Sequence, residues 1–136
     1  MFLIAFPLLI IPFALYNMIA FLLNMQFTDE LFGITMLSGA RMAVTIGDFL
    51  IAISLFLLYV EILKATRMGI RAIMDHVLSM VLFIAMIIEF IMVQKAATST
   101  FFLLLVLGLI DVMGGFTITI RTAQRDLSVE RVDHNA

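Results

Sequence analysis

The stretch FFLLLVLGLIDVMGGFTITI, residues 101 to 120, contains a single charged side chain, that of Asp111. An α-helix needs roughly 20 predominantly apolar residues to cross the hydrocarbon core of a bilayer, and this stretch has that length. In soluble domains about a quarter of the residues are charged, whereas this chain of 136 residues has 13% charged and 64% hydrophobic residues. The sequence therefore predicts an integral membrane protein.

Three further apolar runs cover about residues 2–23, 44–63 and 73–93. They are too long for the strands of a membrane barrel and lack its alternation. We therefore expect residues 1–136 to form one all-α domain, an antiparallel bundle of four transmembrane helices. The tail, residues 121–136, is expected to prolong the last helix by a turn or two. A cleavable signal peptide is the alternative for the first run, but no positive charge opens it, as such peptides require.

Lysine and arginine are distributed unevenly between the two expected ends of the bundle. One end has Arg41 and Lys95, and the other has Lys64, Arg67, Arg71, Arg121, Arg125 and Arg131. Loops rich in these residues stay in the cytoplasm. We therefore expect both termini in the cytoplasm, in a multi-pass protein of the bacterial cytoplasmic membrane. The outer loop, residues 25–43, mixes acids with apolar residues and is expected to form a short interfacial helix or a hairpin.

Small and polar residues recur on one face of each expected helix. Spacings of three, four and seven residues bring them to the same side. In lipid, such faces are where helices approach closely and share hydrogen bonds. The residues expected to pack there are Gly108, Asp111 and Gly115 in the last run, Gly47 and Ser54 in the second, and Asn17 in the first.

Asp111 is expected near the middle of the membrane, level with Ser54. Because burial favours the neutral form of a carboxylic acid, one interpretation is a packing residue that donates a hydrogen bond to Ser54, Asn17 or a backbone carbonyl. The alternative is a proton- or cation-carrying acid, because ionisable residues inside a membrane are functional candidates by default. The outer entry of its path would be Asp48 and Glu89.

Charged residues are also expected at the two membrane surfaces. On the outer side, Arg41 and Lys95 are expected to act as counter-charges to the path. The inner-interface charges are Glu61, Lys64, Arg67, Arg71 and Asp75, where Asp75 is expected to pair with Arg71, and Glu61 with Lys64 or Arg67. In the first run, Pro12 is expected to kink the helix and to free the carbonyl of Leu8.

The sequence contains no recognisable motif for catalysis or for a cofactor. It lacks a Gly-rich phosphate loop, a nucleophile elbow and an HExxH signature, and it has no cysteine. The carboxylates lack the Glu-x-x-His partner that a di-iron bundle uses, and His76 lacks the second membrane histidine that a bis-histidine haem needs. We therefore expect no enzyme activity, no metal, no cofactor and no nucleic-acid partner.

The segment FLLYVEILKATRMG, residues 56 to 69, and the two runs that follow it look like the phosphate-starvation-inducible PsiE type. The similarity is an aromatic residue and a glutamate, here Tyr59 and Glu61, at the inner end of a span before a short basic link. More broadly, the whole chain resembles the uncharacterised small four-helix inner-membrane proteins of bacteria. The resemblance implies an inner-membrane protein and assigns it no activity.

Two functions remain open at this point. The favoured hypothesis is a non-enzymatic structural, accessory or partner-binding component of the membrane, in which Asp111 holds the helices together. The alternative is a small proton- or cation-linked transporter or channel subunit. Four short helices enclose little space, so a transporter would act as a homo-oligomer. Replacing Asp111 by Asn separates the two hypotheses, because Asn keeps the size and the hydrogen bonding but carries no carboxyl proton.

Overall fold

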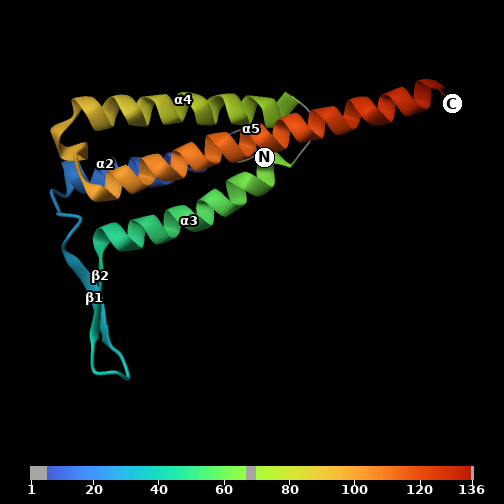
Figure 1. The fold of residues 1–136 in the computed structure, drawn as a ribbon. Helices are drawn as coiled ribbons and strands as arrows, with labels where there is room; N and C mark the ends of the chain where they lie inside the picture. Colours follow the sequence, from blue (N-terminus) through green and yellow to red (C-terminus); the bar gives the residue numbers. More distant parts are fainter. Residues whose placement is uncertain (1–5, 67–69, 136) are drawn as a thin grey trace.

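The computed structural model describes residues 6–66 and 70–135, and most of them are helical (Figure 1). Its elements are α2 (Ile10–Asn17), the π-helical turn η1 (Met18–Leu22), β1 (Glu30–Thr35), β2 (Arg41–Thr45), α3 (Ile46–Ala65), α4 (Ile70–Met92), the 3-10 turn η2 (Gln94–Ala96) and α5 (Ser99–Asn135). The expectation of an all-α fold is confirmed, whereas the expectation of four membrane-length helices is met by three among the described residues. Three of its helical stretches are long and apolar enough to cross a membrane, namely Ile46–Ala65, Ile73–Met92 and Ser99–Ile118.

Helix α5 lies between α3 and α4 and packs against both (Figure 1). Helices α3 and α5 run in the same direction, and α4 runs in the opposite one. Two close approaches fix the register of α3 against α5. The Thr100 hydroxyl lies directly on Gly47 at the start of both helices, and Ala65 faces Gly115 further along. Because Gly47 has no Cβ, the two helices can come close at their starts.

The first helix is shorter than the predicted span 2–23, of which residues 2–5 lie outside the described residues. It begins at Ile10, after a turn in which the Leu8 carbonyl accepts a hydrogen bond from the Ile11 N–H. Pro12 is therefore in the first turn of the helix, where the amide hydrogen that proline lacks would have no intrahelical partner. The expected kink at Pro12, with a free Leu8 carbonyl, is wrong for this reason.

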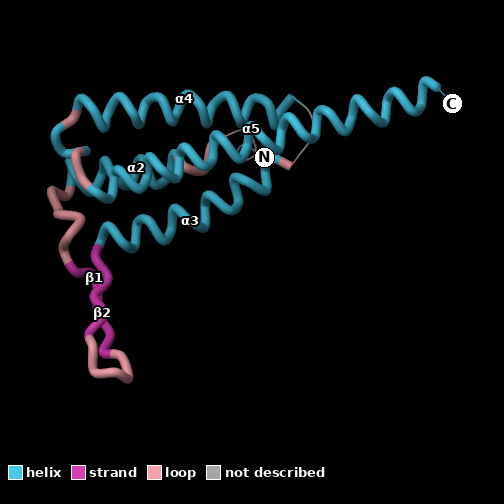
Figure 2. Tube along the Cα trace, viewed as in Figure 1, coloured by secondary structure: helices cyan, strands magenta, loops and turns pink. Residues whose placement is uncertain are grey.

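The outer loop folds as a hairpin, one of the two forms expected for it. Strands β1 and β2 pair antiparallel with Thr35 opposite Arg41, and Figure 2 shows the hairpin projecting away from the helices. Gly39 has a φ of 89° in its turn, a conformation that glycine adopts without strain. The Arg41 guanidinium donates hydrogen bonds of 2.6 and 3.1 Å to the Glu30 carboxylate. Arg41 is thus engaged within the hairpin, and its expected role as a counter-charge to the intramembrane acids is wrong.

Helix α5 continues well beyond its membrane-length segment. Its 37 residues span about 55 Å at a rise of 1.5 Å per residue, nearly twice the hydrocarbon thickness of about 30 Å. The expectation of one or two extra turns after residue 120 was therefore too short. Figure 1 shows the end of α5 extending past the other helices, on the side opposite the hairpin.

Aromatic side chains fill the core at the hairpin end of the bundle. Tyr16 and Phe101 are fully buried, with their ring centroids 4.8 Å apart in an edge-to-face arrangement, and the Phe27 ring stacks on Tyr16 at 4.2 Å. The Tyr16 hydroxyl donates a 2.8 Å hydrogen bond to the Lys95 carbonyl and lies 2.7 Å from the Thr98 hydroxyl. These contacts join α2 to the connection between α4 and α5.

Candidate functional site: a buried cluster of charged residues

Five polar side chains from three helices meet in the interior, at the end of the bundle opposite the hairpin. We call this group the Lys64 cluster; it consists of Glu61 and Lys64 from α3, Asp75 and Ser79 from α4, and Asp111 from α5. The exposed fractions are 3% for Glu61, 9% for Lys64, and 5% for each of the other three residues. Burying a charged side chain is strongly unfavourable unless it is paired and hydrogen-bonded, so the partners within the cluster determine what it can do.

Lys64 is the cation that links these groups. Its Nζ lies 3.1 Å from Glu61 Oε1 and 3.4 Å from Asp75 Oδ1, and it donates a 2.6 Å hydrogen bond to the Phe6 carbonyl. An ammonium group has three donors, and these three acceptors use all of them. Glu61 also accepts a hydrogen bond from the Leu8 N–H. The cluster therefore fastens the segment before α2 to both α3 and α4.

Asp111 joins the cluster from α5. Its carboxyl lies beside the Ser79 hydroxyl, and the charges of Glu61, Asp75 and Lys64 are close enough to act on it. Ser79 follows Asp75 by one helical turn, so both face α5. Among the described side chains, Lys64 is the one cation in contact with Glu61 and Asp75. Two carboxyl groups thus contact one buried ammonium, and a third lies near them.

Asp111 lies level with Glu61 and not, as expected, with Ser54. Ala65 faces Gly115 in two helices that run in the same direction, so the residues one turn earlier, Glu61 and Asp111, also face each other. The expected depth was counted from the ends of the apolar runs, whereas the register depends on where the glycines allow close packing. Asp111, expected at the midplane, and Glu61 and Asp75, expected at the inner surface, therefore lie in one cluster.

Neither side chain expected to bond with Asp111 does so in the structure. The Ser54 hydroxyl donates to the Leu50 carbonyl of its own helix at 2.7 Å. The Asn17 amide donates to the Phe13 carbonyl at 3.0 Å and to Glu89 Oε2 at 3.4 Å. Ser79, which the sequence analysis did not select, takes their place beside Asp111.

Gly108 and Gly115 face α4, as their predicted packing role requires. A Cβ at Gly108 would lie 3.0 Å from the Phe83 ring, and a Cβ at Gly115 would lie 3.0 Å from His76 Nδ1. The His76 ring stacks on Phe116 at 5.8 Å, and its Nε2 is buried with no hydrogen-bond partner among the described residues. A Cβ at either glycine would require the Phe83 ring or the His76 ring to shift by a few tenths of an ångström.

The outer acids are engaged elsewhere and do not extend the cluster into a path. Asp48 forms a capping box with Thr45 at the start of α3, in which each side chain accepts a 3.1 Å hydrogen bond from the other residue's backbone N–H. Glu89 accepts its hydrogen bond from Asn17. The Lys95 ammonium donates to two oxygens at the end of the first helix, and not to either acid. The expected outer entry of Asp48 and Glu89, with Lys95 as counter-charge, is therefore not assembled.

At the inner surface, Glu61 was expected to pair with Lys64 or with Arg67, and the structure shows the pair with Lys64. Asp75 also contacts Lys64, where a pair with Arg71 was expected. Arg67 and the side chain of Arg71 lie outside the described residues, so the predictions for them stay predictions.

Comparison of the chain with protein-family models, with curated proteins and with solved structures finds no match. The resemblance to the PsiE type therefore stays a prediction. Across the part of the chain that the structure describes, no three His, Asp or Glu side chains are arranged to hold a metal ion. The function has to be argued from the Lys64 cluster itself.

Proposed function

We propose that the protein is a small proton-linked membrane transporter or channel subunit, and that the Lys64 cluster is its proton-binding site. The observation that carries the proposal is a buried group of three carboxyl groups with one described cation, whose ammonium contacts two of them. The apolar stretches of α3, α4 and α5 would form the spans, in the bacterial cytoplasmic membrane. The excess of Lys and Arg away from the hairpin favours a cytoplasmic position for the end of α5.

The chemistry follows from the balance of charge in the cluster. With every group ionised, the described side chains of the cluster would place three carboxylates with one cation in a buried site, and an uncompensated buried charge is strongly unfavourable. Protonating a carboxyl group removes this imbalance without moving a helix. Because Asp111 belongs to a group of acids, it has neighbouring groups with which it can exchange protons.

A structural role is the second candidate, and one observation favours it. Glu61 and Lys64 bond to the backbone of Leu8 and Phe6 as well as to side chains, which is what a fastening between helices requires. In that case the cluster would stabilise the fold of an accessory or partner-binding protein.

The first candidate, a transporter, would act as a homo-oligomer, since the helices of one chain enclose little space.

Proton flux in proteoliposomes distinguishes the two candidates. Purified protein is reconstituted with a pH-sensitive dye trapped inside, and an imposed potential drives proton uptake. We expect measurable flux in the parent and a loss of at least about tenfold in Asp111→Asn, since a proton carrier cannot function without its titrating group. Asp75→Asn should reduce the flux in the same direction.

The matched control is Glu30→Gln, which removes one carboxylate from the exposed hairpin and should leave the flux unchanged. All variants are compared at equal thermal stability and oligomer size. Absence of flux in the parent, or equal flux in the parent and Asp111→Asn, would reject the transporter and leave the structural role.

A further inference from the structure

The hairpin is a two-stranded sheet whose two faces differ in chemistry. In its register Phe32 pairs with Val44, and Ile34 pairs with Met42. Residues that lie opposite each other in a sheet, or two positions apart along a strand, share a face. These four side chains therefore form one surface, which we call the apolar face. Three of them are exposed, Phe32 at 43%, Ile34 at 50% and Met42 at 40%.

The opposite face holds the ion pair of the hairpin. On this side Gly33 pairs with Ala43, and Thr35 pairs with Arg41. The Arg41 guanidinium and the Glu30 carboxylate both lie where a Cβ of Gly33 would be, so their ion pair covers this face. The hairpin is therefore amphipathic, with one face suited to water and the other suited to an apolar environment.

The described part of the chain does not cover the apolar face. Figure 2 shows the hairpin projecting away from the helices, and its tip adds Met36, exposed at 42%, and the fully exposed Leu37. An isolated two-stranded hairpin is at best marginally stable in water, and apolar side chains gain free energy when they leave water. A surface that covers the apolar face would therefore stabilise the hairpin.

The position of the hairpin indicates which surface this is. Strand β2 ends at Thr45, and the membrane-length helix α3 begins at the next residue, Ile46. The hairpin therefore leaves the bundle at the level where the apolar stretch of α3 begins, and Phe49 in the first turn of α3 is exposed as well, at 46%. Figure 1 shows the hairpin extending sideways, across the direction of the helices. In a membrane crossed by these helices, it would run along the surface.

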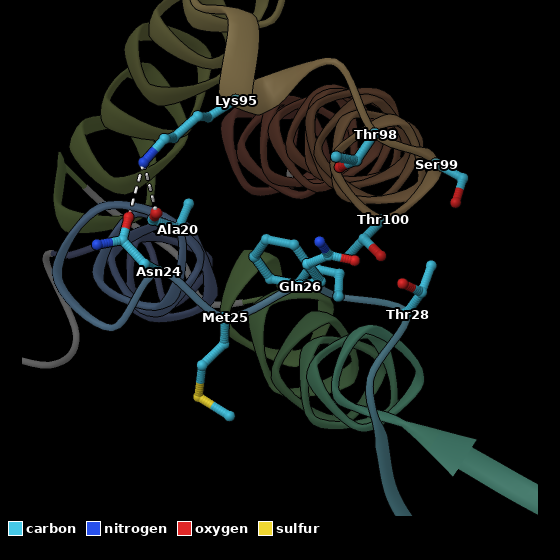
Figure 3. A pocket seen from close by; sticks show the side chains of 10 residues that line it. Ala20, Asn24, Met25, Gln26, Thr28, Lys95, Thr98, Ser99 and Thr100 are labelled. Atoms are coloured by element: carbon cyan, nitrogen blue, oxygen red, sulfur yellow. Dashed lines mark hydrogen bonds between the residues drawn. The ribbon is translucent and has the colours of Figure 1, made fainter.

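Attraction to anionic headgroups does not explain such a position. Residues 25–45 contain two acids and one base, and this base, Arg41, is paired with Glu30. At the same end of the bundle, the Lys95 ammonium is turned to the end of the first helix, where it donates a 2.9 Å hydrogen bond to the Asn24 amide oxygen (Figure 3). Contact with a membrane would therefore depend on the apolar side chains and not on the charge of the lipid.

We propose that the hairpin lies on the membrane surface with its apolar face inserted among the lipids, as an anchor at the start of α3. Amphipathic segments of this kind bury their apolar side by about 5–10 Å at the boundary between headgroups and acyl chains. The ion pair of Glu30 and Arg41 stays in water on the other side. The partner of the apolar face is thus the bilayer, and not a second protein chain. The anchor does not depend on the proposed proton transport, because no residue of the hairpin belongs to the Lys64 cluster.

Tryptophan fluorescence tests the proposal without background, because the chain has no tryptophan. Phe32→Trp and Ile34→Trp are reconstituted in phosphatidylcholine vesicles with brominated or with ordinary acyl chains, since bromine quenches tryptophan only at short range. We expect the brominated lipid to lower the emission of both variants at least about twofold, as for a side chain at the acyl-chain boundary. Adding phosphatidylglycerol should leave this quenching unchanged.

Thr35→Trp is the matched control on the opposite face. Brominated lipid should quench it much less than Ile34→Trp, and acrylamide in the water should quench it more. Leu37→Trp lies in the turn, where it leaves the strand pairing intact, and should be quenched like Ile34→Trp. Phe56→Trp in α3, where the native side chain is 77% exposed, is the positive control for contact with lipid.

Two results would overturn the proposal. One is equal quenching of Ile34→Trp and Thr35→Trp by brominated lipid, because it would show that the hairpin has no lipid-facing side. The other is quenching of Phe56→Trp without quenching of Ile34→Trp and Leu37→Trp. In that second case, emission of Ile34→Trp at short wavelength would identify a protein surface as the cover of the apolar face, and emission at long wavelength would identify water.

Discussion

Lys64 lies in the last turn of α3, where a lysine of a membrane helix usually extends its side chain to the interface. Its ammonium is turned inward because Glu61 precedes it by three residues on the same side of the helix and Asp75 lies opposite on α4. The outward alternative would leave both acids buried without a cation among the described side chains. The contacts with Glu61 and Asp75 therefore hold the Lys64 ammonium inside the bundle.

We predict that Lys64→Met lowers the free energy of unfolding by about 3–5 kcal/mol, the usual loss when one partner of a buried ion pair is removed. Methionine keeps the length and the apolar character of the side chain, so the loss would come from the stranded acids. Unfolding in mixed micelles with rising dodecyl sulfate, followed by circular dichroism, measures the difference. Lys95→Met is the control, since Lys95 bonds neutral oxygens and should lose less. A loss below about 1 kcal/mol for Lys64→Met would show that the acids are already neutral.

The hairpin of β1 and β2 is the element most exposed to water, and one ion pair joins its strands. Hydrogen bonds from the Arg41 guanidinium hold the pKa of the Glu30 carboxyl below its usual 4.5, and the same contact raises the pKa of Arg41. An acid with a lowered pKa stabilises the folded form fully above its unfolded value and loses this contribution as the pH falls through the lowered value. The pair should therefore support the hairpin at neutral pH and fail in acid.

Carbon-13 NMR of the Glu30 carboxyl measures this directly. We expect a titration midpoint below 4.5 in the parent and a higher midpoint in Arg41→Gln, which removes the charge and most of the donors. Hairpin amide shifts in the parent should change across the same pH range, and those of Glu30→Gln should not. Equal midpoints in the parent and Arg41→Gln would show that the pair does not form in solution.

For the individual elements, the sequence predicts the positions of the long helices better than the residues at which helices begin, or the form of the hairpin. The runs 44–63, 73–93 and 101–120 overlap α3, α4 and α5 because a long apolar run has few other options in lipid. The start of the first helix was misplaced because Pro12 suits a first turn as well as a kink. The motif TIGD, residues 45–48, signals the capping box, and reading it would have assigned Asp48 to the start of α3.

At the scale of the whole molecule, the residues of the site were partly predictable and their arrangement was not. The seven-residue spacing of Gly47, Ser54 and Glu61 correctly places them on one face of α3, and all three are buried there. Which residue of α5 meets that face depends on a register that side-chain packing sets, and no local pattern encodes it. The pairing of Glu61 with Asp111 and the choice of Ser79 as neighbour both follow from that register.

The proposed immersion in a membrane predicts that the hairpin and the end of α5 lie on opposite sides of it. The chain has no cysteine, so single substitutions give a labelling test without background. Ser38→Cys in the hairpin turn and Gln124→Cys in α5, both at exposed positions, are treated with a membrane-impermeant maleimide. From the uneven distribution of Lys and Arg, we expect Ser38→Cys to react in intact cells and Gln124→Cys to react only in inverted vesicles.

Leu104→Cys, buried at 2% exposure, is the control and should react in neither. Labelling of both exposed positions from one side would contradict three crossings by α3, α4 and α5, and labelling in the reverse sense would keep the crossings but invert the proposed orientation.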